Sequence, residues 1–287
     1  MNRIVYLNGE YVREEEAKVS IFDRGFLMAD AVYEVTAVLN GMLIDFDAHV
    51  ARLRRSMGEL DMPFQYVTDG LHDIHLRLIR KNGLTDGLVY LQITRGNPQD
   101  RDFPFPEETT TSPTIVLFTQ NKPGLAHHPL AEQGTSVISM PDLRWARRDI
   151  KTVQLLYPSL CKMAAKNAGA NDAWMILDGF VTEGTSNNAW IVRGKTVITR
   201  PTSQEILHGI TRAAITRLAE QDGLTVEEHP FTLDEAKAAD EAFSTSAAAF
   251  VMPVVQIDEV KIGDGTPGPT TRRLRQIYLE MAGVVGK

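Results

Sequence analysis

The chain has 287 residues and 43% hydrophobic content, which is enough to bury the core of one large or two smaller domains. A formal net charge of −7 argues against nucleic acid or an anionic membrane surface as a partner. The single cysteine, Cys161, cannot form an internal disulfide, and no apolar run approaches membrane-spanning length, so we expect a soluble protein of the cytoplasm.

The first 120 residues are expected to form an α+β domain. Asn8-Gly9 predicts a hairpin within residues 3–12, because this dipeptide favours the tight turn between paired strands. Apolar and β-forming runs predict three further strands, over residues 31–39, 88–94 and 113–120. Helical patterns predict two helices, over residues 46–60 with Asp45 or Asp47 as the cap, and over residues 67–81 with a stop at Asn82-Gly83.

A second domain is expected after a short linker. Asn121 to Gly124 is rich in turn-forming residues and lies between apolar runs, so we place the linker at residues 121–125. Beyond it, residues 126–287 mix short strands with helices. The helices are expected over residues 158–168, 210–222, 232–240 and 269–282. The prediction is an α+β fold of two domains, a smaller one over residues 1–120 and a larger, strand-rich one with peripheral helices.

Lys151 and Glu183 are the residues whose chemistry stands out in the second half. Lys151 lies before an apolar run, where desolvation would disfavour its ammonium form and leave an amine able to attack a carbonyl group. Glu183 lies at a predicted strand end and could hold a proton on a heterocyclic nitrogen. Pyridoxal phosphate chemistry needs both groups. Taken singly, the two residues are better explained as a solvated lysine at a strand end and a glutamate in a turn; their spacing and order favour the chemical interpretation.

The order of motifs around these two residues resembles a known family. DIK at residues 149–151, followed by AK, AGA, DG and VTEGTSNN, is similar to fold type IV aminotransferases that use pyridoxal phosphate, especially D-amino-acid aminotransferases. The likeness runs from residues 4–12 to about residue 275. It implies the fold type IV architecture, pyridoxal 5′-phosphate as the cofactor, Lys151 as the catalytic residue that bonds to it, and Glu183 as the partner of its ring nitrogen. No metal is expected.

The cofactor phosphate has several candidate ligands. The segment His208–Arg212 enters a predicted helix whose first amides can bind an anion, although capping by Thr211 would explain the same pattern. Helical periodicity leaves both Arg52 and Arg54 open as the basic partner, and the family pattern selects Arg52. The resemblance assigns the remaining cofactor contacts to Leu207, Ile210, Thr211, Ser246 and Ala247. Core packing alone would explain Leu207 as well.

Three residues are candidates for substrate binding. Tyr33 matches the tyrosine that D-amino-acid aminotransferases direct at the substrate carboxylate, although a packed strand aromatic would look the same. Arg101 can bind a carboxylate through two hydrogen bonds. Phe103 stands where those enzymes have a histidine, so we expect looser selection for carboxylates. The segment from Gly25 to Val35 also resembles (R)-selective amine aminotransferases, with Met28 where they commonly have histidine.

The resemblance implies ping-pong transfer of an amino group from a D-amino acid, and from some (R)-primary amines, to a 2-oxo acid. It also implies a homodimer in which the carboxylate-binding loop comes from the neighbouring subunit. Three alternatives stay open: an (R)-selective amine:pyruvate transaminase, a branched-chain L-amino-acid aminotransferase, and an aminodeoxychorismate lyase-like enzyme. A non-catalytic binding module that kept the fold is disfavoured, because Lys151 and Glu183 are both present.

Overall fold

The computed structural model describes residues 3–107 and 109–284, and for Gln65 it describes the backbone alone. Contacts divide the chain into two compact units. The first contains the chain up to Leu125 and the short segment Ile150–Gln154. The second contains residues 126–149 and the chain from Leu155 onward. The predicted division into two domains did not include the separate segment Ile150–Gln154.

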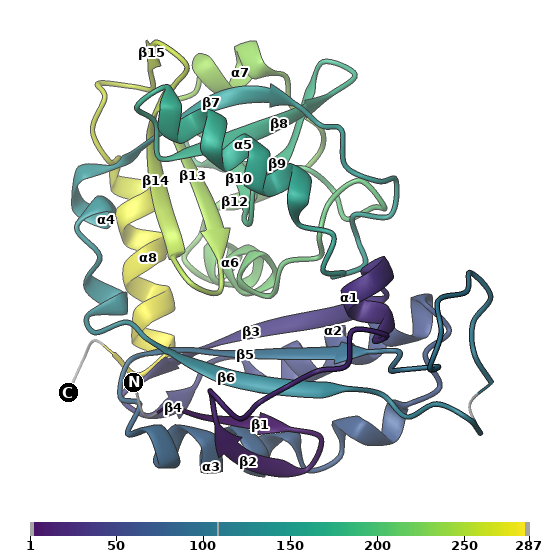
Figure 1. Cartoon of the computed structure of the whole chain (residues 1–287). Coiled ribbons are helices and arrows are strands. Elements are labelled where there is room, and N and C mark those ends of the chain that lie inside the picture. Colours follow the sequence, from purple (N-terminus) through teal and green to yellow (C-terminus); the bar gives the residue numbers. More distant parts are fainter. Residues whose placement is uncertain (1–2, 108, 285–287) are drawn as a thin grey trace. The chain divides into compact units, whose positions relative to one another are not determined.

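The first unit is built on an antiparallel sheet with the strand order β2-β1-β6-β5-β3-β4 (Figure 1). Its strands are β1 (Ile4–Leu7), β2 (Glu10–Arg13), β3 (Ala31–Leu39), β4 (Met42–Leu43), β5 (Gly87–Thr94) and β6 (Ile115–Asn121). Its helices are α1 (Arg24–Met28), α2 (Phe46–Glu59), the 3-10 helix η1 (Gln65–Thr68) and α3 (Leu71–Asn82). Helix α2 packs on β3, and α3 packs on β1 and β6. The sheet therefore has one face covered by helices.

Local sequence signals account for most of these elements. Asn8 and Gly9 both have positive φ, 48° and 101°, as the predicted two-residue hairpin turn requires. The predicted strand over residues 31–39 has the bounds of β3. Asp45 occupies the N-cap of the following helix, as one of the two predicted caps, but its φ is 52° and its side chain makes no capping bond. Helix α3 begins later than expected, since η1 and Gly70 precede it.

The Lys151 segment occupies an edge of β3 that β4 leaves open. Strand β4 pairs only with the last two residues of β3. Along the first part of the same edge, Thr152 forms an antiparallel bridge with Val32. The Tyr33 amide donates to the Lys151 carbonyl oxygen at 3.0 Å, and the Val153 amide donates to the Ala31 carbonyl oxygen at 3.3 Å. The lysine is thus held on a rigid sheet edge.

The second unit is built on a mixed sheet with the strand order β12-β11-β10-β13-β14-β7-β8-β9, with β15 paired to β14. Its strands are β7 (Thr135–Pro141), β8 (Asp172–Leu177), β9 (Phe180–Gly184), β10 (Asn188–Arg193), β11 (Thr196–Thr199), β12 (Thr225–Glu228), β13 (Glu241–Ser246), β14 (Phe250–Ile257) and β15 (Val260–Lys261). Parallel pairing joins β11 to β12 and places β7 between β14 and β8. The core between this sheet and its helices includes Trp174, Phe231 and Ile257.

The four predicted helices of the second unit lie close to their expected places, and the short helices α4 (Leu130–Gln133) and η2 (Leu125–His127, a 3-10 helix) were not predicted. The four predicted helices are α5 (Leu156–Asn167), α6 (Ile210–Gln221), α7 (Leu233–Lys237) and α8 (Pro269–Met281). Figure 1 shows α8 running beside β14. Helix α7 is shorter than predicted, because the Asp240 amide already bonds to the Val192 carbonyl oxygen of β10. Cys161 is buried on α5, as expected of a small hydrophobic residue.

A membrane-spanning helix would need a long apolar stretch, and none of the helices within the described ranges has one.

Candidate active site

Lys151 and Tyr33, two residues singled out in the sequence, lie together in the first unit. Because their backbones pair at the edge of β3, their side chains emerge on the same face of the sheet. The Lys151 Nζ atom lies 4.1 Å from the centre of the Tyr33 ring. The Tyr33 ring also stacks on Tyr90, and Tyr90 stacks on Phe118, with centroid distances of 5.6 and 4.7 Å. Tyr33 is therefore both a packed strand aromatic and a direct neighbour of the lysine.

Arg52 is held by a buried ion pair. Its Nε and Nη2 atoms donate to the two carboxylate oxygens of Glu34 at 2.8 and 2.7 Å. His49 Nδ1 lies 2.7 Å from the same carboxylate, so one acid orients both side chains. Ser56, one turn further along α2, accepts a hydrogen bond from the Lys151 amide at 3.3 Å. One face of α2 thus carries Arg52 and supports the Lys151 segment.

The neighbouring arginines of α2 have different surroundings. Arg54 donates from Nε to the Thr68 hydroxyl at 2.8 Å, and its side chain is about half exposed. Arg55 lies 3.6 Å from Glu59 on the same helix. Helical periodicity left Arg52 and Arg54 open, whereas burial in the structure distinguishes them. The role of Arg52 as a phosphate ligand stays a prediction.

The Glu34 carboxylate should make stability depend on pH in the acid range. Burial alone would raise the pKa of Glu34, but Arg52 and His49 outweigh burial and lower it to about 2. Since the unfolded chain titrates near 4.5, this contribution is complete above that pH and is lost as the pH falls toward 2. Urea unfolding of the wild type and Glu34→Gln should show a difference in unfolding free energy that shrinks by on the order of 3 kcal/mol across this window. A difference that is the same at pH 6 and pH 3 would contradict this assignment.

Arg101 and Phe103 lie on the loop between β5 and β6. Phe103 is 72% exposed, and the Arg101 guanidinium lies 5.1 Å from its ring. Among the described residues, no hydrogen bond, ion pair or ring contact joins either residue to Tyr33 or Lys151. The three candidate substrate residues belong to the same unit, but no such interaction joins Tyr33 to the other two.

Arg24, which the sequence analysis did not single out, anchors that loop. Its Nη1 donates to the Asp102 carbonyl oxygen at 2.6 Å and to that of Pro104 at 3.3 Å, and its Nε donates to Asp30 at 2.7 Å. Asp30 also accepts from Arg95 Nε at 2.8 Å. Arg24 lies in the sequence SIFDRG at residues 20–25, but its partners at residues 102 and 104 are far away in the sequence. No local pattern therefore indicated this contact.

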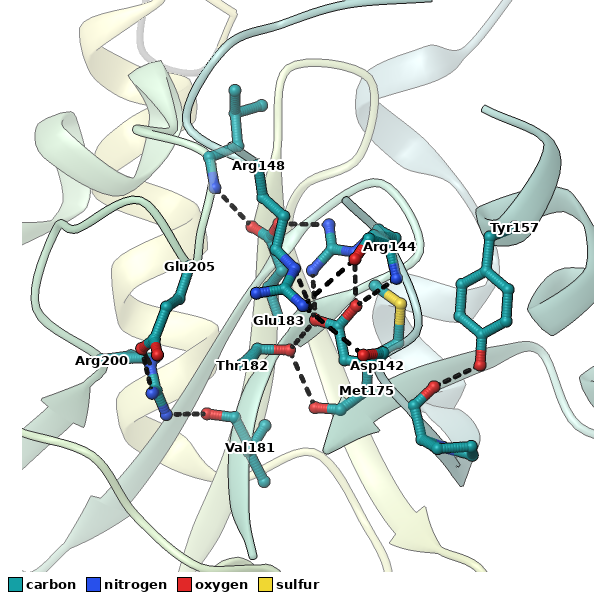
Figure 2. Close-up of polar contacts among 12 residues, drawn as sticks. Asp142, Arg144, Arg148, Tyr157, Met175, Val181, Thr182, Glu183, Arg200 and Glu205 are labelled. Atoms are coloured by element: carbon teal, nitrogen blue, oxygen red, sulfur yellow. Dashed lines mark hydrogen bonds and ion pairs between the residues drawn. The ribbon is translucent and has the colours of Figure 1, made fainter. Parts of the chain in front are cut away.

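Glu183 lies at the end of β9 in the second unit and is buried (Figure 2). Arg144 Nη1 donates to Oε1 at 2.6 Å. Oε2 accepts from Asn188 Nδ2 at 2.9 Å and from the Leu207 amide at 3.1 Å. Burial raises the pKa of Glu183, and Arg144 opposes this effect without cancelling it. A carboxylate in this setting can hold a proton on a neighbouring ring nitrogen.

The charged residues that surround Glu183 were not predicted from the sequence. Arg144 also donates from Nη2 and Nε to Asp142, at 2.7 and 2.9 Å, so it lies between two acids. The Thr182 hydroxyl donates to Asp142 at 2.7 Å, and Arg148 Nε lies 3.4 Å from it (Figure 2). The only sequence signal was a run of charges, PDLRWARRD, inside an otherwise apolar approach.

The start of α6 has backbone amides suited to an anion. Gly209 is the N-cap and Thr211 is the second helical residue, so the reading of Thr211 as the cap is wrong. No side-chain capping bond to the first turn of α6 occurs in the chain as described. A Cβ atom added to Gly209 would lie 1.9 Å from Asn188 Oδ1, so only glycine allows this approach. The helix dipole and the first amides of this 12-residue helix together favour a bound phosphate.

Ser246 and Ala247 begin the turn from β13 to β14. The Ser246 hydroxyl oxygen accepts from the Ala249 amide at 3.1 Å, which leaves its proton for another acceptor. Thr245, just before the turn, lies opposite Asn188 in the pairing of β10 with β13. Asn188 Nδ2 also donates to the Leu207 carbonyl oxygen at 2.9 Å. Asn188, another residue that the sequence analysis missed, therefore connects Glu183, the α6 entry and the Ser246 turn.

These residues of the second unit fit pyridoxal phosphate. A buried carboxylate is available for the ring nitrogen, and Leu207 is fixed directly beside it through its backbone. Helix amides at Ile210 and Thr211 and the Ser246 hydroxyl are suitable donors for a phosphate. The lysine and arginine predicted to complete the site belong to the first unit.

Comparisons with known proteins agree with a site for pyridoxal phosphate. A model of the family described as amino-transferase class IV matches residues 31–257. The chain is 39% identical over 271 residues to a D-alanine aminotransferase of Bacillus licheniformis, covering 94% of each chain. It is 37% identical over 273 residues to a D-alanine aminotransferase of Staphylococcus aureus (strain N315), covering 95% of each.

Solved structures of related enzymes have the same fold. A branched-chain amino acid aminotransferase from Thermobaculum terrenum in its PLP-form is similar with a TM-score of 0.83 and 25% identity, covering 99% of this chain and 95% of that one. A branched-chain amino acid aminotransferase from Escherichia coli is similar with a TM-score of 0.88 and 24% identity, covering 100% and 97%. Both the two-sheet α+β fold and the expected family resemblance are thus confirmed.

Proposed function

The chain belongs to the class IV aminotransferase family and uses pyridoxal phosphate, and we propose that it transfers the amino group of a D-amino acid to a 2-oxo acid. The observation that carries this substrate assignment is the placement of Tyr33, the predicted carboxylate-binding tyrosine, against Lys151. The identity of 36–39% to D-alanine aminotransferases supports it further. The branched-chain L-amino-acid alternative is weaker, because the structures of that class share only 24–26% identity with the chain.

Each residue has a defined task in this reaction. The bound cofactor supplies an aldehyde that condenses with amines and a ring that accepts electrons. Lys151 Nζ removes the proton from the substrate α-carbon as a general base and returns a proton as a general acid. Glu183 keeps the ring nitrogen protonated by its negative charge, with Arg144 and Asn188 fixing both carboxylate oxygens. Arg52, Ile210, Thr211 and Ser246 hold the phosphate and so set the orientation of the reacting atoms.

The proposed enzyme is a homodimer. Leu156, Leu160 and Met163 recur along one face of α5 and are all more than half exposed. In the first unit, Ile21 and Phe26 are exposed in the same way. Exposed apolar patches of this kind mark protein interfaces. A partner subunit would cover them and could supply the loop that carries Arg101, and the mass of the protein in solution tests this arrangement.

Arg101 should distinguish substrates with and without a carboxylate. We expect Arg101→Ala to lower kcat/KM for D-alanine by on the order of tenfold to a hundredfold, the effect of losing a charge-assisted pair. Turnover of (R)-1-phenylethylamine, which lacks a carboxylate, should change by less than about twofold. With Phe103 in place of histidine, the wild type should accept this amine to a measurable extent.

Steady-state kinetics with 2-oxoglutarate or pyruvate as the acceptor measures both quantities, and Arg13→Ala on the exposed strand β2 is a matched control. Equal losses on the two donors would assign Arg101 a structural role. A wild-type preference for L-leucine over every D-amino acid would overturn the proposed substrate class.

A further inference from the structure

The turn between β13 and β14 leads into a residue whose backbone conformation is unfavourable, the first residue of β14. Phe250 has a φ of 61°, in the left-handed region, and its side chain is fully buried. Residues with a Cβ atom rarely adopt this conformation, and they keep it only when their surroundings enforce it. Phe250 follows the Ser246–Ala249 bond directly, so the same backbone determines where Ser246 lies.

Arg275 on α8 holds the carbonyl groups on both sides of Phe250. Its Nη1 atom donates to the Ala249 carbonyl oxygen at 2.8 Å and to that of Val251 at 2.6 Å. Its Nη2 atom donates to the Ala126 carbonyl oxygen at 2.7 Å. The guanidinium also lies 5.8 Å from the centre of the Phe250 ring. One side chain thus binds the carbonyl groups of both neighbours of the left-handed residue.

The choice of arginine at this buried position is costly for the fold. Its three bonds go to uncharged backbone oxygens, and Arg275 is only 7% exposed. Burial lowers the pKa of Arg275 to about 10, and the charge of Glu132 only partly opposes this effect. A buried charge must be offset by the bonds that it makes. Here two of those bonds hold the backbone on either side of Phe250, next to the turn that carries Ser246. The conformation of this turn is therefore the feature that Arg275 stabilises.

We propose that Arg275 is a positioning residue for the phosphate end of the cofactor. Arg275 fixes the backbone at Ala249 and Val251. The Ala249 amide then stays in place to donate to the Ser246 hydroxyl oxygen, which leaves the hydroxyl proton of Ser246 available for the phosphate. The inference rests on the proposed assignment of the Ser246 turn to the phosphate. It does not depend on which amino donor the enzyme prefers.

Comparing pyridoxal 5′-phosphate with pyridoxal tests this role directly. The two ligands share the aldehyde and the ring, so the ratio of their dissociation constants isolates the phosphate. In titrations of the apoenzyme followed by absorbance, Arg275→Met should weaken pyridoxal 5′-phosphate on the order of tenfold, the effect of about one net bond to a charged group. Its affinity for pyridoxal should stay within about twofold. Ser246→Ala should show the same pattern, and the double variant should add little to Arg275→Met.

Two further variants keep the test decisive. Arg273→Met removes an exposed arginine of the same helix, which is paired with Asp222, and should change neither affinity. If Arg275→Met does not fold, Arg275→Lys retains a charge but cannot reach all three oxygens, and it should lower the affinity for pyridoxal 5′-phosphate alone. Equal weakening of both ligands, or no weakening of either, would overturn the proposal. Since no amino donor is present, an error in the proposed substrate would leave this result unchanged.

Discussion

Lys151→Ala should abolish transamination, with a loss of at least ~10⁴-fold in kcat/KM for a D-amino acid. The physical reason is that one amine performs two tasks, bonding to the cofactor and moving the substrate proton. The β3 edge that holds Lys151 is formed by backbone bonds, so the alanine variant should keep its fold. Circular dichroism and a thermal melt check this, and borohydride reduction of the wild type followed by peptide mapping should place the cofactor on Lys151.

Two other lysines provide the controls for this result. Lys162 and Lys166 both lie on α5 in the same stretch of sequence, and Lys162 pairs with Asp172 at 3.2 Å. Lys166→Ala should retain nearly full activity. A cofactor label on Lys162 or Lys166, or substantial turnover by Lys151→Ala, would remove Lys151 from its assigned role.

Glu183→Gln should keep the cofactor bound but slow the half-reaction with a D-amino acid on the order of a hundredfold or more. An amide has no charge with which to hold the ring nitrogen's proton, so the ring becomes a weaker electron acceptor. Rapid mixing of the holoenzyme with D-alanine, followed by absorbance, measures the half-reaction without turnover. The bound cofactor is quantified separately after gel filtration.

The effect of Glu183→Gln on folding stability has to be measured separately from its effect on the rate of the half-reaction. Removing the carboxylate leaves two arginines, the largely buried Arg144 and Arg148, against the single acid Asp142, and an excess charge in a buried site is destabilising. The double variant Glu183→Gln/Arg144→Met removes that charge and should recover stability while staying slow. A half-reaction as fast as that of the wild type in either variant would show that Glu183 does not support the ring.

Local patterns predicted the elements of this fold well, because strand and helix signals depend on neighbouring residues. The hairpin at Asn8-Gly9 and the strand over residues 31–39 follow from turn chemistry and β-forming side chains. Helix caps were less predictable. Asp45 and Thr211 have the right chemistry, but the backbone places Asp45 in a left-handed conformation and Thr211 too far into the helix to cap it.

The residues of the candidate site also differ in whether a local sequence pattern indicates them. Lys151, Glu183 and Arg52 lie in distinctive motifs, so the sequence alone could propose them as site residues. Arg144, Asn188, Arg24 and Arg275 act through partners that are distant in sequence or through backbone atoms, and such contacts leave no local pattern. The placement of the Lys151 segment could not be predicted for the same reason, since no periodicity indicates that residues 151–153 pair with the edge of β3.

That segment has a consequence for the order in which the protein can form during synthesis. Strand β3 exists once residue 39 has been made, but the residues that cover its edge are about 110 positions further along the chain, at Ile150–Gln154. Until then the nascent first unit has an unpaired strand edge, which is a template for pairing with other chains. The same delay means that the first unit cannot display Lys151 before residues 126–149 of the second unit have been translated. The predicted reactive amine and the cover of the exposed strand edge therefore arrive in a single step, near the middle of synthesis.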